Sequence, residues 1–170
     1  MNEWIAADWP APERLVAGTT LRSHDLSVLP PSGECCWLNQ VHGTKIVTAT
    51  HFDNPPDADG SIGGASRYTC VVKTADCLPV LICSTDGSIF AAVHAGWRGL
   101  AAGVIENAIT KLAVEPSELL VWLGPAISQP SFEVGDEVRA AFLVNDRGSA
   151  DCFAANSRQR WRWLRPRRLP

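Results

Sequence analysis

Three residues of the sequence carry side chains that bind soft divalent metals: His42, Cys77 and His94. One thiolate and two imidazoles form a ligand set for zinc, and three protein ligands with a fourth position open are typical of a catalytic site. The three residues lie far apart in the sequence, so the fold would have to bring them together. The alternative is that Cys77 packs as a small apolar residue and that each histidine forms ordinary hydrogen bonds.

The residues that follow His94 could bind an anion. His-Ala-Gly-Trp-Arg-Gly at 94–99 leads into an apolar pattern of helical period, so the amides from Gly96 onward would lie at a helix N-terminus. Arg98 adds a guanidinium suited to phosphate or carboxylate, although an exposed ion pair would also explain it. Asp76, beside Cys77, could accept a hydrogen bond from a metal-bound histidine or could cap a turn.

The elements that must position these side chains indicate an α/β or α+β domain. Short apolar and β-branched runs predict strands over 15–21, 41–48, 68–73, 79–83, 89–93 and 119–123, the second interrupted near Gly43, with a hairpin at Asp86-Gly87. Apolar residues three and four apart predict helices over 100–112 and 134–143. Segments rich in proline and glycine at 27–34 and 53–64 are predicted to be loops. Mixed β-sheets flanked by helices, in a single domain, account for this order.

Composition narrows the classes of partner. The chain has 170 residues, 46% of them apolar, which suffices for one domain with a sizeable core. Outside the last thirteen positions acidic residues outnumber basic ones by two to one, so no nucleic-acid partner is expected. We also expect no membrane partner, because no stretch approaches the roughly 18 apolar residues of a membrane span. The first eleven residues lack the basic start of a secretory signal, which predicts a cytoplasmic protein with reduced cysteines.

A series of short segments supports a more specific interpretation. They are Asn39-Gln40-Val41-His42-Gly43, Ala58-Asp59-Gly60, Thr-Ala-Asp-Cys-Leu-Pro at 74–79, His-Ala-Gly-Trp-Arg-Gly-Leu at 94–100, Leu-Gly-Pro-Ala-Ile at 123–127 and Phe-Glu-Val-Gly at 132–135. In this order the segments resemble the signature motifs of the laccase-domain family over residues 37 to about 143. That family was formerly called multicopper polyphenol oxidoreductases and is now regarded as purine nucleoside phosphorylases with adenosine deaminase activity.

The resemblance implies a fold, a metal and substrates. It implies two mixed sheets flanked by helices, zinc on His42, Cys77 and His94, and a purine nucleoside and phosphate as small-molecule substrates. The residues themselves indicate metal-assisted attack on a small, partly anionic ligand. The candidate catalytic residues are Asp76, Arg98 and Asp59. The candidate substrate-binding residues are Asn39, Gln40, Lys45, Gly96 and Arg22, the last because it resembles the arginine that ends the family's first strand.

The two ends of the sequence depart from the family pattern. Members of the family are usually longer, and here only residues 24–36 fill the segment that precedes Asn39. We expect residues 1–160 to form one domain that is incomplete at its C-terminus. Residues 161–170 then form a basic tail, disordered or aberrant, such as a frameshift or a truncated reading frame would produce. A genuine basic tail for acidic partners is the alternative.

Three other functions use the same residues. A thiolate and two imidazoles also suit copper, but oxidation of phenols by a multicopper centre needs more than the four histidines of this sequence. A cysteine hydrolase would use Cys77 as nucleophile and His94 as its base. A catalytically impaired, truncated metal-binding remnant would explain the departures at both ends.

Overall fold

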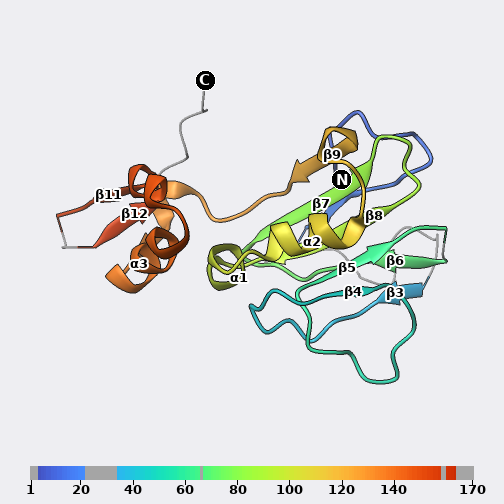
Figure 1. The fold of residues 1–170 in the computed structure, drawn as a ribbon, viewed down its shortest axis with the longest axis horizontal. Coiled ribbons are helices and arrows are strands. Elements are labelled where there is room, and N and C mark those ends of the chain that lie inside the picture. The colour runs from blue at the N-terminus through green and yellow to red at the C-terminus, as the bar shows by residue number, and fades with distance from the viewer. Residues whose placement is uncertain (1–3, 22–33, 66, 158–159, 164–170) are drawn as a thin grey trace. The chain divides into compact units, whose positions relative to one another are not determined.

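The computed structural model describes residues 4–21, 34–65, 67–157 and 160–163. Arg22, one of the predicted substrate-binding residues, lies outside them, as does most of the predicted loop at 27–34. Contacts divide the chain into two compact units, Met1–Pro125 and Ala126–Pro170. Figure 1 shows strands and helices mixed along the chain, and the predicted mixed α/β class is confirmed.

The first unit is built on a mixed sheet with the strand order β4-β5-β8-β7-β9. The strands are β4 (Ile46–Thr48), β5 (Gly60–Gly63), β8 (Phe90–Ala95), β7 (Leu78–Ser84) and β9 (Leu119–Leu123). β4 and β5 run parallel, and every other neighbouring pair is antiparallel. The predicted hairpin is therefore confirmed as β7 and β8. Gly87 lies in its turn with a φ of 66°, a conformation that glycine adopts without steric cost.

Two helices replace the single helix predicted over 100–112. α1 (Trp97–Ala101) and α2 (Val104–Leu112) are separated at Gly103, whose φ of 91° no continuous helix contains. α2 packs against β8, β5 and β4, as Figure 1 shows. Its buried side chains, Val104, Ala108 and Leu112, join the strand residues of the main hydrophobic core. The apolar spacing identified this buried face correctly, but the glycine break was missed.

The loop predicted over 53–64 is wrong for its last part. Residues Gly60–Gly63 form β5, which is buried throughout and lies between β4 and β8. A Cβ on Gly60 would lie 2.7 Å from Cδ1 of Ile46 and 3.0 Å from the carbonyl oxygen of Ala92. Close packing therefore requires a glycine at position 60. Because glycine is also common in loops, this central strand resembles a loop in the sequence. The strand predicted over 41–48 begins only at Ile46.

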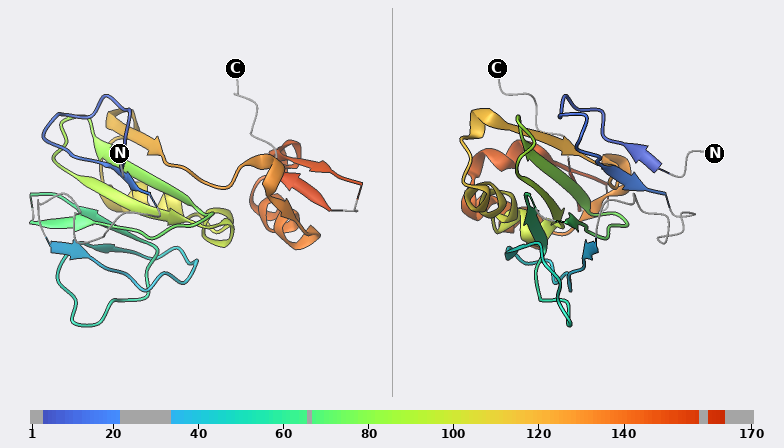
Figure 2. Two further views of the ribbon diagram at one scale, coloured as in Figure 1. Left: turned by 180° about the vertical axis from the view of Figure 1, so that it is seen from behind. Right: turned by 90° about the vertical axis from the view of Figure 1, so that its right-hand side faces the viewer.

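Two smaller strand pairs complete the first unit. β1 (Trp4–Ala6) pairs with β2 (Gly18–Thr20) in antiparallel orientation, and β3 (Glu34–Cys36) pairs with β6 (Tyr68–Cys70) in parallel. Neither β1 nor β3 was predicted. Figure 2 shows the β3–β6 pair from behind, and β6 also contacts β5 of the main sheet. A second core of Cys36, Leu38, Ala49 and Ala58 lies here. A short 3₁₀ helix, η2 (Pro116–Glu118), leads into β9.

The second unit contains a three-stranded antiparallel sheet with the order β10-β12-β11. Its elements are η3 (Gln129–Ser131), β10 (Glu133–Val134), α3 (Asp136–Asn145), η4 (Arg147–Cys152), β11 (Phe153–Ala155) and β12 (Trp161–Trp163). α3 covers most of the helix predicted over 134–143. The first three residues of the predicted tail form β12, whose backbone pairs with both β10 and β11. The predicted domain limit at residue 160 stays a prediction.

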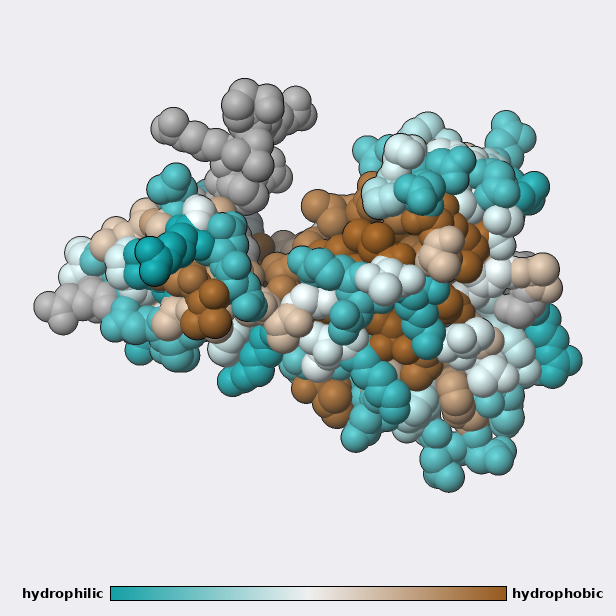
Figure 3. Space-filling view, in the orientation of Figure 1, coloured by the Kyte–Doolittle hydropathy of each residue, from teal (hydrophilic) through white to brown (hydrophobic). Residues whose placement is uncertain are grey.

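Apolar surface remains on the first unit. Figure 3 shows brown surface over the region of β7 and β9, and Val121 and Leu123 of β9 have 49% and 60% of their surfaces exposed. None of the helices within the described ranges is long and apolar enough to cross a membrane.

Candidate metal centre

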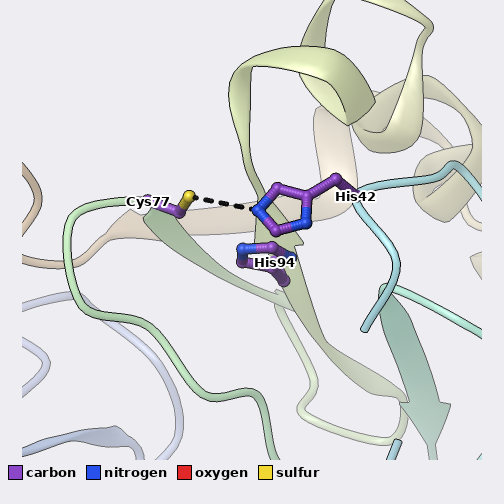
Figure 4. A group of neighbouring side chains, drawn as sticks. All are labelled: His42, Cys77 and His94. Carbon is purple, nitrogen blue, oxygen red and sulfur yellow. Dashed lines mark hydrogen bonds between the residues drawn. The ribbon is translucent and has the colours of Figure 1, made fainter. Parts of the chain in front are cut away.

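The fold brings His42, Cys77 and His94 together. One ligand atom from each of the three residues lies within 4.8 Å of the other two, an arrangement that could hold a metal ion. Sγ of Cys77 is 3.8 Å from Nε2 of His42. The two imidazole rings meet edge to face, with centroids 4.7 Å apart and planes inclined by 81° (Figure 4). It is the one such cluster of three or more histidine, cysteine or acidic residues in the described part of the chain.

The β7–β8 hairpin places two of the three ligands. Cys77 directly precedes β7, and His94 is the penultimate residue of β8, which extends past the strand predicted over 89–93. Because Leu78 pairs with Ala95 and Pro79 pairs with His94, the antiparallel register brings the start of β7 beside the end of β8. His94 is 3% exposed, whereas His42 comes from the loop that precedes β4 and is exposed.

Asp59 holds both histidines through hydrogen bonds. Its carboxylate is fully buried and lies 2.8 Å from Nδ1 of His94. The same carboxylate accepts hydrogen bonds from the backbone N–H groups of His42 at 2.9 Å, Gly43 at 2.7 Å and Val41 at 3.3 Å. Since the carboxylate accepts from Nδ1–H, Nε2 of His94 keeps its lone pair for an ion. The carboxylate that orients His94 is therefore Asp59, and not Asp76.

The backbone of His42 has an unusual conformation. Its φ of 59° lies in the left-handed region, which non-glycine residues seldom adopt. The hydrogen bonds from His42 and Gly43 to Asp59 hold this turn in place. Left-handed residues of this kind cluster at ligand sites, where the surrounding structure stabilises them.

Two glycines leave room for the histidine loop. A Cβ on Gly96 would lie 2.6 Å from Cδ2 of His42 and 3.4 Å from Sγ of Cys77. A Cβ on Gly99 would lie 2.7 Å from the carbonyl oxygen of Gly43. The glycines of the His-Ala-Gly-Trp-Arg-Gly segment thus allow α1 to approach the loop closely. Gly96 is the N-cap of α1, so the amides that follow it lie at a helix N-terminus as predicted, although α1 has only five residues. Binding of an anion there stays a prediction.

The three ligands line a pocket of about 490 Å³. Its other walls come from two segments, and the lining residues are Leu38, Asn39, Gln40, Lys73, Thr74, Ala75 and Asp76. Lys73 was not among the predicted site residues. Its ammonium lies 5.1 Å from the centre of the Trp37 ring, a cation–π contact that sequence reasoning could not have found without the fold.

The remaining predicted residues have different positions. Asp76 lines the pocket and is exposed. Arg98 is exposed, with its guanidinium 4.4 Å from the centre of the Trp97 ring, and it does not line the pocket. Lys45 accepts a hydrogen bond from the backbone N–H of Asp59 through its carbonyl oxygen, and its side chain is exposed.

Neighbouring groups shift the pKa of the Cys77 thiol. Burial, followed by the negative charges of Asp76 and Asp59, raises the pKa of the Cys77 thiol. A metal cation has the opposite effect, because it binds and stabilises the thiolate. The protein therefore has a candidate metal site in a pocket. Two imidazoles and one thiolate meet there, and a buried carboxylate holds Nδ1 of His94.

The chain belongs to the multi-copper polyphenol oxidoreductase laccase family, whose sequence profile matches residues 14–165. The family resemblance found in the sequence motifs is thereby confirmed. A purine nucleoside phosphorylase of Pseudomonas aeruginosa is 40% identical over 184 aligned positions, which cover 92% of this chain and 76% of the relative. The purine nucleoside phosphorylase YfiH of Escherichia coli is 37% identical and is covered to 75% of its length.

Solved structures show the same fold. A crystal structure of a Neisseria meningitidis protein matches with a TM-score of 0.88 and 34% identity, covering 96% of this chain and 79% of that one. The crystal structure of YlmD from Geobacillus stearothermophilus matches with a TM-score of 0.63 and 22% identity over 77% of this chain and 54% of that one, and it supports the fold alone.

Proposed function

We propose that this chain is a zinc-dependent purine nucleoside phosphorylase that acts on adenosine and inosine and also deaminates adenosine. The observation that carries the proposal is the convergence of His42, Cys77 and His94 within 4.8 Å at a pocket of about 490 Å³. The purine nucleoside phosphorylase of Pseudomonas aeruginosa, at 40% identity, supplies the substrate class.

Zinc suits the three donors. Thiolate and imidazole are its usual ligands, and three protein ligands leave a position open for a reacting group. Bound there, zinc would polarise an oxygen of phosphate or water as a Lewis acid. Copper is the less favoured occupant, because a multicopper centre needs additional imidazoles. Of the other two histidines in the sequence, His51 bonds the exposed Asp53 at 3.3 Å, and His24 lies outside the described residues.

Phosphorolysis and deamination break and form different bonds in the pocket. Phosphorolysis replaces the bond between ribose and purine by a bond to a phosphate oxygen, and the base leaves with a proton. Deamination replaces the exocyclic amino group by an oxygen from water, and ammonia leaves. Asp76 is the acidic side chain among the lining residues, and we assign to it the proton transfer that both reactions need. Asp59 acts through the histidines that it holds, so its role is to position them.

Binding of the substrates is assigned to the rim of the pocket. Asn39 lines the pocket, and Gly96 gives space beside His42 and Cys77. Arg98 would hold phosphate only after leaving the Trp97 ring, and Lys45 would have to reach in from outside the lining residues. Arg22 keeps its predicted role as a proposal. The cytoplasmic location also stays a prediction.

The test is an assay of the purified chain loaded with zinc. Inosine with phosphate should yield hypoxanthine and ribose 1-phosphate, and adenosine alone should yield inosine and ammonia, both separated by liquid chromatography. The matched control is His94→Ala, which removes a ligand that is 3% exposed, and it should abolish both products. If the wild-type chain binds zinc but forms neither product, the proposed function is wrong.

A further inference from the structure

Gln40 makes a pair of hydrogen bonds that no other lining residue of the pocket makes in the described structure. Its Nε2 donates to the carbonyl oxygen of Lys73 at 2.8 Å, and its Oε1 accepts from the backbone N–H of Lys73 at 2.7 Å. One side-chain amide thus satisfies both backbone groups of one residue. The pattern imitates the exchange of hydrogen bonds between neighbouring strands.

The two segments joined by this amide carry two of the metal ligands. Gln40 lies two residues before His42, and Lys73 lies four residues before Cys77. The segments begin as the parallel pair β3–β6, in which Cys36 pairs with Cys70. Beyond that pair no main-chain hydrogen bond joins residues 37–43 to residues 71–77, both of which are fully described. The Gln40 side chain therefore joins the two segments by hydrogen bonds beyond the point where the strand pairing ends.

Apart from the Gln40 pair, the two segments meet through the contact between Sγ of Cys77 and Nε2 of His42 and through the Lys73 ammonium over the Trp37 ring. The other hydrogen bonds of residues 39–43 lead to a different segment. Asn39 bonds the segment that carries Asp59, through Nδ2 to Oδ1 of Asp57 at 2.5 Å and through its backbone to Pro56 and Ala58. The hydrogen bonds of His42 and Gly43 to Asp59 secure the loop to the same segment and, through it, to His94. None of these other hydrogen bonds reaches the segment that carries Cys77.

We infer that Gln40 is a positioning residue of the metal centre, which sets the distance between His42 and Cys77 by joining their two segments. This inference rests on the proposed metal site and replaces the predicted role of Gln40 in substrate binding. Asp59 couples His42 to His94, and Gln40 couples His42 to Cys77. A site of one thiolate and two imidazoles whose ligands come from distant segments needs such outer contacts to keep the ligand atoms at one point.

The test is the zinc affinity of Gln40→Met, which keeps the length of the side chain and removes both hydrogen bonds. We expect its zinc dissociation constant, measured by chelator competition, to rise about 10–100-fold. Gln129→Met is the matched control, because it makes the same exchange of side chain in η3, at a residue that does not line the pocket. Its dissociation constant should stay close to that of the wild type. Equal affinities of wild type and Gln40→Met would overturn the inference.

Two further measurements separate this role from others. Gln40→Glu keeps the acceptor for the Lys73 N–H but loses the donor, so an intermediate dissociation constant supports positioning even where Gln40→Met does not fold. Substitution by Co²⁺ reports ligand geometry directly, and a changed absorption spectrum in Gln40→Glu is expected. A raised KM with unchanged zinc affinity would instead assign Gln40 to the substrate. The zinc dissociation constant and the Co²⁺ spectrum need no turnover, so they test the inference even if the chain binds zinc without acting on nucleosides.

Discussion

The carboxylate of Asp59 accepts the Nδ1–H of His94 at 2.8 Å while both side chains are almost completely buried. The same carboxylate accepts the backbone N–H of His42, so one acidic residue orients one metal ligand and holds the loop of another. A buried acceptor with this many donors is costly to remove, because each donor is left without a partner and without water.

Asp59→Asn should destabilise the protein and weaken the metal site together. The amide offers one acceptor and turns an N–H₂ group toward donors, so we expect a loss of about 2–3 kcal/mol in the free energy of unfolding. Zinc affinity should fall about 10–100-fold. Urea unfolding of the metal-free protein and chelator competition measure the two effects. Asp53→Asn, at an exposed position, is the control and should change neither. A stable variant with normal zinc affinity would contradict the role of Asp59.

Gly96→Ala should distort the metal site with little change in the rest of the fold. The added Cβ would lie 2.6 Å from Cδ2 of His42 and 3.4 Å from Sγ of Cys77, so the ring must move from its position in the site. We expect weaker zinc binding, measured by chelator competition. Gly64→Ala is the control. Its Cβ would meet only the carbonyl oxygen of Ser88 at 3.3 Å and none of the candidate ligands. Equal zinc binding by Gly96→Ala and the wild type would show that the loop adapts.

The sequence revealed the candidate metal ligands and most of the hairpin that carries two of them. His42, Cys77 and His94 were identified by side-chain chemistry and by their motifs, and β7, β8 and β9 by their apolar runs. Asp59 was predicted to be catalytic, and Asp76 was predicted either to accept a hydrogen bond from a metal-bound histidine or to cap a turn. The acceptor for His94 is Asp59. Adjacency in sequence favoured Asp76, whereas pairing of β5 with β8 places Asp59, the residue before β5, beside His94.

The missed features depend on contacts between distant residues. β5 has the sequence Gly-Ser-Ile-Gly, and its strand conformation follows from its position between two strands rather than from its own propensity. Lys73 and Gln40 meet because their segments leave the β3–β6 pair side by side. No local pattern contains this information. Gly103 did carry a local signal, since glycine within a helical pattern often marks a break.

Zinc should raise the thermal stability of the wild-type chain, and Cys77→Ala should lose that increase. A ligand that binds only the folded state stabilises it by about 2.7 kcal/mol at one hundred times its dissociation constant. Differential scanning calorimetry with and without excess chelator measures the shift in Tm. His51→Ala removes a histidine outside the cluster and should keep the response. Loss of the zinc response in His51→Ala, or its survival in Cys77→Ala, would contradict the assigned ligands.

The free energy of unfolding should decrease in alkaline solution, because the thiol of Cys70 ionises more readily in the unfolded chain than in the folded protein. Burial is the main cause that raises the pKa of this thiol from 9.0 to about 12 in the folded state. Below pH 9 the thiol is protonated in both states and contributes fully. Above pH 9 the unfolded chain releases the proton and the folded chain keeps it, so stability decreases until the folded thiol also ionises. The expected loss is about 1.4 kcal/mol between pH 8 and pH 10. Urea unfolding of wild type and Cys70→Ala across this range isolates the effect, because other titrating groups are common to both. The wild-type curve should fall more steeply than that of Cys70→Ala, and parallel curves would show that the thiol ionises equally in both states.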